Sequence, residues 1–378
     1  MSCGGGVEYL PTKLSHLTTL TPRSIAMSFQ VPQKFRAFTA DEKAKGSVKE
    51  VSTPALGEND VLVKVSYAAQ NPTDWKHLSF FSPKGAIIGG DVAGTVVAVG
   101  SNIRAPLKVG DKVAGIVHGN LYTEQGTFAE YTRAQSDVLF KIPEGLSEAD
   151  ASTFGVAWYT ALQALVQSQG AQWPPAKVEG EPWYLVYGGS TSVGLFALQV
   201  ARILGYKPIT VASPRNFDLV KSYGAEHVVD YSDPEKTIEE IKRVTGGGVK
   251  IGLDTISEGK SFEIAAKSFA PGGGRLNAIL WPTDEQKAVR PDVEIVTTLM
   301  YTLFGHSFTT FGKHYEVIPE DYQFGQEAAA RTPDLITKYN IKANPIDLRG
   351  GLDAVQEGLD FQKAGKVSAK KLVYKIAQ

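Results

Sequence analysis

The chain has 378 residues, a length typical of about two domains, and its 43% hydrophobic content is ample for buried cores. Its 39 basic and 40 acidic side chains leave a formal net charge of −1, so no whole-chain field favours nucleic acid or an anionic membrane. With one cysteine, Cys3, the chain cannot form an intramolecular disulfide or a cysteine-built zinc site. No apolar run reaches the ~18 residues of a spanning helix. We therefore expect a cytoplasmic protein without nucleic-acid or membrane partners.

The N-terminal region, residues 1–30, is predicted to be a flexible tail. Its first 27 residues are rich in Ser, Thr and Gly and carry Lys13 and Arg23 but one acid, Glu8. This composition faintly resembles a mitochondrial targeting segment, so a mitochondrial location is the alternative to the cytoplasm. Met27 precedes the first patterned segment and is an alternative start.

Short β-type segments separated by turns follow, from Phe35 to Pro143. They are DVLVKVSYAA, DVAGTVVAVGS, GDKVAGIV, GTFAEYTRA and DVLFKIP. Alternating β-branched residues bounded by Gly-Asp and Pro predict a mostly antiparallel, barrel-like domain. We assign residues 31–155 and 311–378 to it, because a further strand, KKLVYKI, lies at the C terminus. Between about Thr310 and that strand we expect irregular pieces and one helix, GGLDAVQEGLDFQKAG.

Strands and helices alternate in the middle of the chain, after a helix with Ser147 as its N-cap. The predicted strands cover 181–189, 207–213, 226–231, 249–256 and 275–281, and 293–305 closes the sheet. The predicted helices cover 191–206, 215–225, 233–247 and 262–273. This order predicts an α/β fold with a doubly wound parallel sheet over residues 156–310, inserted into the barrel domain.

The turn VYGGSTSVG, residues 186–194, joins a predicted strand to a predicted helix. Such a turn aims backbone N–H groups and the positive helix end at an anion, usually a pyrophosphate. Gly189 and Gly194 match the first and third glycines of the dinucleotide fingerprint, but Thr191 takes the middle place. We expect hydroxyl groups to replace the lost backbone contact, or the turn to be a structural helix cap. The predicted phosphate site comprises Ser190, Thr191, Ser192 and Val193.

The end of the next strand, ITVASPRN, predicts which nicotinamide cofactor is bound. An acid there would accept bonds from the 2′-hydroxyl of NADH, and none is present. Ser213, Arg215 and Asn216 offer donors instead, and arginine suits the 2′-phosphate of NADPH. Tyr231, after the following strand, adds a hydroxyl. NADPH is therefore the predicted cofactor, and a solvated surface Arg215 is the alternative.

Several motifs together resemble the medium-chain dehydrogenase/reductase superfamily from Phe35 to Ile376. They are QNPTDWK, GGDVAGTVVAVGS, LKVGDKVAG, GTFAEY, VAWYTAL, the glycine turn and KVSAKKLVYKI. The resemblance implies a GroES-like barrel domain and an inserted Rossmann domain. Zinc enzymes of the superfamily carry Gly-His-Glu where this chain has Gly89-Gly90-Asp91, and the six histidines show no ligand spacing, so no metal is expected.

Within the superfamily the chain resembles the zinc-free quinone and enoyl reductases. NPTDWK, YGGSTSVG, SPRNFDLVKSYGAEHVVDY and FGKHYEVIPEDYQFG resemble fungal trans-acting enoyl reductases and their ToxD-like relatives most. This implies hydride transfer from NADPH to an enoyl or enone double bond, on a small-molecule or carrier-bound acyl substrate. A quinone reductase and a catalytically silent NADPH-binding protein are the alternatives. A monomer is slightly favoured over a homodimer.

The resemblance also implies site residues in the barrel domain. Thr73, Asp74, Trp75 and Lys76 would border the nicotinamide and its ribose, with Lys76 as the first candidate for polarising the enolate and Asp74 orienting Lys76 or backbone donors. The alternative for Lys76 is a solvated loop lysine. Some relatives place a tyrosine proton donor shortly after this motif, where this chain has Phe80-Phe81, so the donor stays open.

Further residues are implied at the junction between the domains. Thr153, Phe154, Gly155 and Tyr159 would line the substrate cleft, with Thr153 also near the cofactor, while Trp158 and Leu162 are expected in the core. Ala278 and Ile279 would offer backbone groups to the nicotinamide, and Val367 and Ser368 would also contact the cofactor. Residues 298–302, including Met300 and Tyr301, would form the far apolar wall, or else a buried part of the sheet domain.

Overall fold

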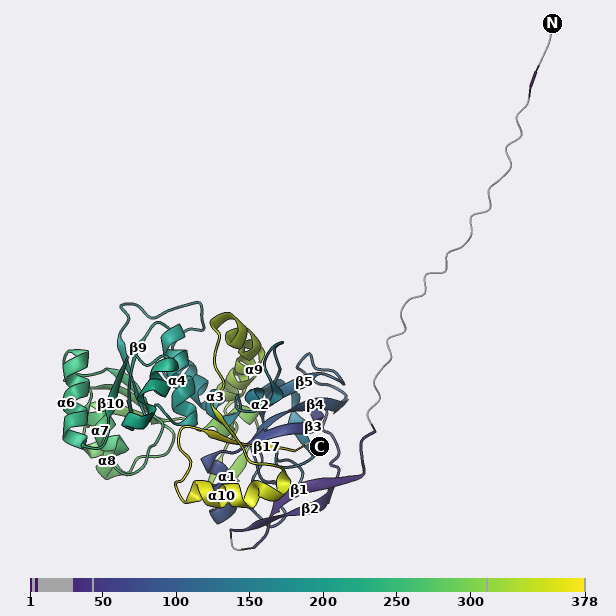
Figure 1. Cartoon of the computed structure of the whole chain (residues 1–378), viewed down its shortest axis with the longest axis horizontal. Helices are drawn as coiled ribbons and strands as arrows, with labels where there is room; N and C mark the ends of the chain where they lie inside the picture. The colour runs from purple at the N-terminus through teal and green to yellow at the C-terminus, as the bar shows by residue number, and fades with distance from the viewer. Residues whose placement is uncertain (2–3, 6–29, 43, 311, 377–378) are drawn as a thin grey trace.

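The computed structural model describes Met1 and residues 4–5, 30–42, 44–310 and 312–376. The predicted flexible tail, its targeting signature and the alternative start at Met27 fall almost entirely outside these ranges. Within the described part of the chain, no helix is long and apolar enough to cross a membrane. Figure 1 shows two strand-rich halves, with α3 (Val156–Leu162) and α9 (Pro319–Tyr339) between them.

One half is built on a sheet that has seven strands among the described residues, in the order β16-β17-β3-β4-β5-β7 with β6 also paired to β3. Its strands are β3 (Asp60–Ala69), β4 (Asp91–Val99), β5 (Lys112–Ile116), β6 (Tyr131–Gln135), β7 (Leu139–Lys141), β16 (Ile346–Leu348) and β17 (Lys371–Lys375). All pairs are antiparallel except β16 with β17. The C-terminal strand β17 lies against β3 and so belongs to this sheet, as expected of the last strand of the barrel domain. A hairpin of β1 (Lys34–Ala40) and β2 (Gly46–Ser52) accompanies this sheet.

The other half contains a parallel sheet with the strand order β10-β9-β8-β11-β12-β13. Its strands are β8 (Trp183–Tyr187), β9 (Lys207–Ala212), β10 (His227–Asp230), β11 (Ile251–Asp254), β12 (Gly274–Ala278) and β13 (Val293–Thr297). The helices of this half are α4 (Ser192–Ile203), α5 (Phe217–Ser222), α6 (Pro234–Thr245), α7 (Ser261–Lys267) and α8 (Asp284–Ala288). The strand order reverses between β8 and β11, and such a switch point opens a crevice at the carboxyl ends of the strands. The predicted fold class is confirmed.

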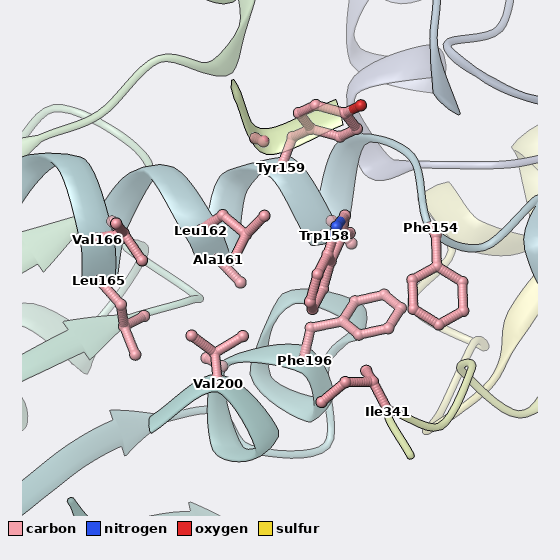
Figure 2. Close-up of a cluster of buried hydrophobic side chains, with 14 of the residues drawn as sticks. Phe154, Trp158, Tyr159, Ala161, Leu162, Leu165, Val166, Phe196, Val200 and Ile341 are labelled. Carbon is pink, nitrogen blue, oxygen red and sulfur yellow. The ribbon is translucent and has the colours of Figure 1, made fainter. Parts of the chain in front are cut away.

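The predicted helix after Ser147 consists of three pieces: α2 (Glu148–Ala151), α3 and the π-helix η2 (Gln163–Ser168). Ser147 caps α2 as expected, accepting a bond from Asp150 N at 3.0 Å. Figure 2 shows Trp158 of α3 facing Phe154 and Phe196. The Trp158 ring centroid lies 5.6 Å from that of Phe154 and 5.4 Å from that of Phe196. Trp158 therefore belongs to the core, as expected.

Three predictions about secondary structure need correction. The predicted strand 293–305 ends at Thr297 and is followed by a 3-10 helix, η4 (Met300–Phe304). The motif TDWK, which the alternative interpretation of Lys76 placed in a loop, lies in a helix, α1 (Pro72–Phe80). The 21-residue helix α9 replaces expected irregular pieces.

The remaining elements are η1 (Ser136–Val138), η3 (Pro214–Asn216), β14 (Phe308–Thr310), β15 (Lys313–Tyr315), η5 (Leu352–Ala354) and α10 (Val355–Lys363).

Candidate active site

A cavity of about 560 Å³ lies where the carboxyl ends of the parallel strands meet α1, α3 and the loop before β17. Most of the predicted site residues line it: Thr73, Lys76, Ser190, Thr191, Ser192, Val193, Ser213, Arg215, Asn216, Tyr231, Ile279, Met300, Tyr301, Val367 and Ser368. Seven do not line it: Asp74, Trp75, Thr153, Phe154, Gly155, Tyr159 and Ala278. The structure thus brings together residues from both halves of the molecule in one wall.

The glycines of the turn after β8 hold strand and helix close together. Gly188 has φ +84°, a left-handed conformation that glycine adopts without strain. A Cβ on Gly194 would lie 2.3 Å from Gly188 O, and one on Gly189 would lie 2.1 Å from Thr210 Oγ1. Only glycine fits at these two places, as the dinucleotide fingerprint requires.

Thr191, the residue in place of the middle glycine, is the N-cap of α4. Its Oγ1 accepts a hydrogen bond from Gly194 N at 2.9 Å and lies 2.9 Å from Thr255 Oγ1. Thr255 donates its own proton to Tyr187 O, so the Thr191 hydroxyl proton points to Thr255. The hydroxyl of Thr191 is therefore occupied by the cap, which was the alternative interpretation. In the described part of the chain Ser190 and Ser192 make no side-chain hydrogen bond, and they remain the predicted phosphate donors.

The residues predicted to bind the 2′-phosphate, which follow β9 and β10, lie at one end of the cavity together with Ser368, a predicted cofactor contact. Ser213, at the end of β9, and Tyr231, after β10, have their hydroxyl oxygens 3.1 Å apart. Arg215 donates from Nη2 to Ser368 Oγ at 3.2 Å, and Ser368 lies in the loop before β17. Three hydroxyl groups and a guanidinium thus converge at one end of the cavity, and this donor set fits a phosphate monoester. The cavity therefore suits a phosphorylated dinucleotide.

The motif Asn71-Pro72-Thr73-Asp74 folds as the start of α1. Asp74 accepts a bond from Asn71 N at 2.7 Å, which belongs to a capping box, and a separate bond from Asn120 Nδ2 at 3.1 Å. The pKa of Asp74 is raised to about 7, mainly by burial and also by the nearby Asp91 carboxylate, against the opposing bonds from Asn71 and Asn120. Asp74 therefore orients backbone and amide donors instead of touching the cavity.

Lys76 is a partly buried helix residue on the cavity wall, and the loop interpretation was wrong. Its Nζ lies 2.5 Å from Glu258 Oε1, an ion pair that joins α1 to the segment after β11. Trp75 packs between Lys76 and Lys363, whose ammonium groups lie 5.7 and 5.8 Å from its ring. The proposed polarising role of Lys76 stays a prediction.

Four residues predicted to line the substrate cleft lie in the core instead. Phe154 and Tyr159 are fully buried, and Tyr159 donates to Val138 O at 3.0 Å. Thr153 donates to Asp150 O at 2.8 Å, and a Cβ on Gly155 would lie 2.2 Å from Asp91 Oδ1. The residues of α3 that do line the cavity are Val156, Ala157 and Thr160, one helical turn apart on the other face. The prediction had the correct segment but the wrong face.

Two further predictions concern the strand ends β12 and β13. Ala278 is fully buried within the sheet, and the next residue, Ile279, lines the cavity. Ile279 N donates to Ser257 Oγ at 3.0 Å. Residues 298–301 line the cavity as the expected far wall, while Thr302 is buried behind it.

A buried ion pair that the sequence analysis missed supports the same wall. Lys371 of β17 lies 2.8 Å from Asp91 Oδ2 and donates to Asn71 Oδ1 at 2.5 Å. Asp91 Oδ1 in turn accepts a bond from Val156 N, at the start of α3, at 2.7 Å. The Asn71 Nδ2 group is buried without a partner in the described structure, on a residue that lines the cavity. A buried unpaired donor at a cavity wall is available to a ligand carbonyl.

The residues do not fit a catalytic zinc ion. Asp91, at the place of the usual Gly-His-Glu glutamate, is bound to Lys371 and to Val156 N. Among the described residues no group of three His, Cys, Asp or Glu side chains could hold a metal. His118 instead stacks on Tyr301, and burial, with His306 and His77 nearby, holds its pKa well below the usual value.

Two family models match the chain: "Alcohol dehydrogenase GroES-like domain" over residues 57–144 and "Zinc-binding dehydrogenase" over residues 192–317. The trans-enoyl reductase ACTTS2 of Alternaria alternata is 38% identical over 347 residues, which cover 90% of this chain and 98% of that protein. The trans-enoyl reductase TOXD of Cochliobolus carbonum is 38% identical over 68% of this chain and 86% of its own length.

Solved structures share the fold at lower identity. The structure of the CurK enoyl reductase has a TM-score of 0.71 at 20% identity and covers 92% of this chain and 100% of its own. A mycobacterial protein solved in complex with NADPH has a TM-score of 0.70 at 22% identity, covering 90% and 99%. The chain therefore belongs to the medium-chain dehydrogenase/reductase superfamily of nicotinamide-dependent oxidoreductases and, within it, to the family of the trans-enoyl reductases.

Proposed function

We propose that the protein is a zinc-independent, NADPH-dependent reductase of carbon–carbon double bonds conjugated to a carbonyl group. The observation that carries the proposal is the cavity itself, which joins a phosphate-binding end to an apolar wall. The phosphate-binding end is formed by Arg215, Ser213 and Tyr231. The apolar wall includes Leu299, Met300 and Ile279. Bound NADPH would supply a hydride, and the protein would supply orientation and charge.

The protein's own residues then have three tasks. The N terminus of α4, with Ser190 and Ser192, would bind the pyrophosphate, while Arg215 would bind the 2′-phosphate. The buried amide of Asn71 would donate to a carbonyl group within the cavity. The apolar wall would exclude water and hold an acyl chain, from either a small molecule or a carrier-bound substrate.

A quinone reductase is the second candidate, because a quinone also accepts a hydride in an apolar cavity. The quinone oxidoreductase of Coxiella burnetii shares the fold with a TM-score of 0.67 at 23% identity over 91% of this chain. The relatives at 34–38% identity carry the name trans-enoyl reductase, which favours the first candidate. A monomeric, cytoplasmic enzyme completes the proposal, and sedimentation of the purified protein tests the monomer.

The test is an absorbance assay of NADPH and NADH oxidation with enoyl thioesters of increasing length, simple enones and quinones. We expect NADPH-dependent reduction of the enoyl thioesters. Turnover of quinones alone would favour the second candidate. Tight NADPH binding without turnover of any acceptor would identify a silent binding protein, and preference for NADH would contradict the assignment of the cofactor.

A further inference from the structure

Reduction of a conjugated double bond needs a proton donor as well as a hydride. Once a hydride has reached the β-carbon, the electron pair of the double bond moves toward the carbonyl group and leaves an enolate. The α-carbon must then take one proton. The residues that follow TDWK include Phe80-Phe81, and a phenyl ring has no proton to give.

The described cavity wall contains two tyrosines, Tyr231 and Tyr301. Tyr231 lies at the phosphate-binding end, bonded to Ser213. Tyr301 comes from η4, directly after Leu299 and Met300 of the apolar wall. Tyr301 is thus the phenol at the end of the cavity where an acyl group would lie.

The Tyr301 hydroxyl is held in one place by a neighbour that also lines the cavity. Its oxygen lies 2.6 Å from Thr73 Oγ1, and Thr73 Oγ1 lies 2.8 Å from His77 Nδ1. The ring itself is fixed between imidazoles: it stacks on His118 at 4.8 Å and meets the edge of His77 at 5.7 Å. A donor whose position is fixed before the reaction needs little reorganisation in the transition state.

The charge state of Tyr301 suits a proton donor. Burial raises the pKa of its hydroxyl well above the usual value, and the carboxylates of Asp74 and Asp91 raise it further, against hydrogen bonds from Thr73 and Asn120. The hydroxyl therefore carries its proton throughout the neutral range. The same bonds from Thr73 and Asn120 would stabilise a short-lived phenolate.

Two cationic residues of this wall, Lys76 and Lys371, are less available as proton donors. Lys76 is paired with Glu258 at 2.5 Å, and Lys371 is buried against Asp91 and Asn71. Transfer of a proton from Lys371 would leave the Asp91 carboxylate buried beside a neutral amine, which is costly.

We infer that Tyr301 is the catalytic acid that protonates the α-carbon, with Thr73 as the residue that positions its hydroxyl. The O–H bond of Tyr301 breaks, its proton forms the new C–H bond with the enolate electron pair, and the oxygen keeps the O–H electrons as a phenolate. Water that enters when the product leaves returns one proton to Tyr301. The inference rests on the proposed function.

The experiment uses the full-length protein with an α-methyl enoyl thioester, whose reduced product has a new stereocentre at the α-carbon. The wild-type protein should give one α-epimer. Tyr301→Phe keeps the stacked ring but removes the proton, and should lower kcat by about 100-fold or more, as loss of a general acid does. Its residual product should be a mixture of epimers, because water then protonates from either side. Its Kd for NADPH should be unchanged.

Three further variants control for structural effects. Tyr122→Phe removes a hydroxyl from a ring that meets the edge of His118 at 5.3 Å but does not line the cavity, and it should retain the wild-type kcat. Thr73→Ser keeps the positioning hydroxyl and should retain most of the kcat. Thr73→Val removes that hydroxyl, and should lower kcat and give a mixture of the two α-epimers.

Wild-type kcat in Tyr301→Phe would overturn the inference. So would a slow, folded Tyr301→Phe protein that still forms the single wild-type epimer, because another group would then deliver the proton. A wild-type protein that oxidises NADPH with none of the enoyl thioesters or enones would instead reject the proposed function, and the role of Tyr301 with it.

Discussion

Under the proposed function, Arg215 is the residue expected to determine the choice between the two nicotinamide cofactors. Its guanidinium lies at the end of a strand that carries no acid. It donates a hydrogen bond to Ser368, which lies in a loop far along the chain. Its bond to Ser368 is to a neutral hydroxyl, so the charge of the guanidinium remains available to a phosphate dianion.

We expect Arg215→Ala to weaken NADPH binding by about 10-fold or more, because charge-assisted bonds contribute roughly 1.5–3 kcal/mol. Binding of NADH, which lacks the 2′-phosphate, should hardly change. Fluorescence titrations with both cofactors measure the difference. Arg202→Ala is the control, because Arg202 is an exposed arginine paired with Glu226 outside the cavity. Equal losses for NADPH and NADH would contradict the assignment of Arg215.

Single residues also show where sequence reasoning stops. Ser190, Ser192 and Arg215 lie where the pattern placed them, because a strand–turn–helix unit and its next strand end are local features. The bond between Thr191 and Thr255 spans 64 positions, and no pattern near Thr191 indicates it. The role of the Thr191 hydroxyl therefore depended on a neighbouring strand.

At the scale of elements, β17, β4, α1 and α3 are joined by one buried ion pair. Lys371 and Asp91 have side-chain exposures of 2% and 0%, and Asp91 also holds the first N–H of α3. Removing one partner from such a pair leaves an uncompensated buried charge.

We expect Lys371→Met to lower the free energy of unfolding by about 3–5 kcal/mol, measured by urea denaturation. The double variant Lys371→Met/Asp91→Asn should recover part of the loss, since no charge is left unpaired. Lys34→Met breaks an exposed pair with Glu50 and should cost about 1 kcal/mol or less. The interpretation fails if Lys371→Met costs no more than Lys34→Met.

Helix α9 is an element that was not predicted from the sequence. Gly325 and Pro333 lie inside it and both disfavour a helix, so the segment looked irregular. Burial of Phe324, Ala328 and Leu335 along one face outweighs those local costs. The strands and helices of the parallel-sheet half had no such conflict, and apart from α8 their succession along the chain was predicted correctly.

At the scale of the whole molecule, the buried Asp74 couples stability to pH. Its pKa is about 7 in the folded protein, mainly because of burial, against the ordinary value of 3.8 expected in the unfolded chain. Between these values the folded chain binds more protons than the unfolded chain. The contribution of Asp74 to the free energy of unfolding therefore falls as pH rises from about 4 to about 7, and is constant above that.

We expect the free energy of unfolding of the wild-type protein to fall relative to that of Asp74→Asn over this range, by up to about 4 kcal/mol. Denaturation curves at several pH values give the two slopes. Asp353→Asn, which changes an exposed carboxylate paired with Arg36, should keep the wild-type slope. Equal slopes for the wild-type protein and Asp74→Asn would show that Asp74 titrates normally.

The sequence by itself determined the fold class and the alternation of strands and helices along the chain, and it predicted the phosphate turn and a strand end that would favour NADPH. Each of these is carried by residues close together in the chain: periodic burial, glycines at a turn, donors at a strand end. Only the tertiary structure decided which face of α3 meets the cavity, that Lys371 neutralises Asp91, and that Thr73 holds Tyr301 across 228 positions. These contacts come from packing two halves of the molecule together, and local periodicity carries no information about such packing.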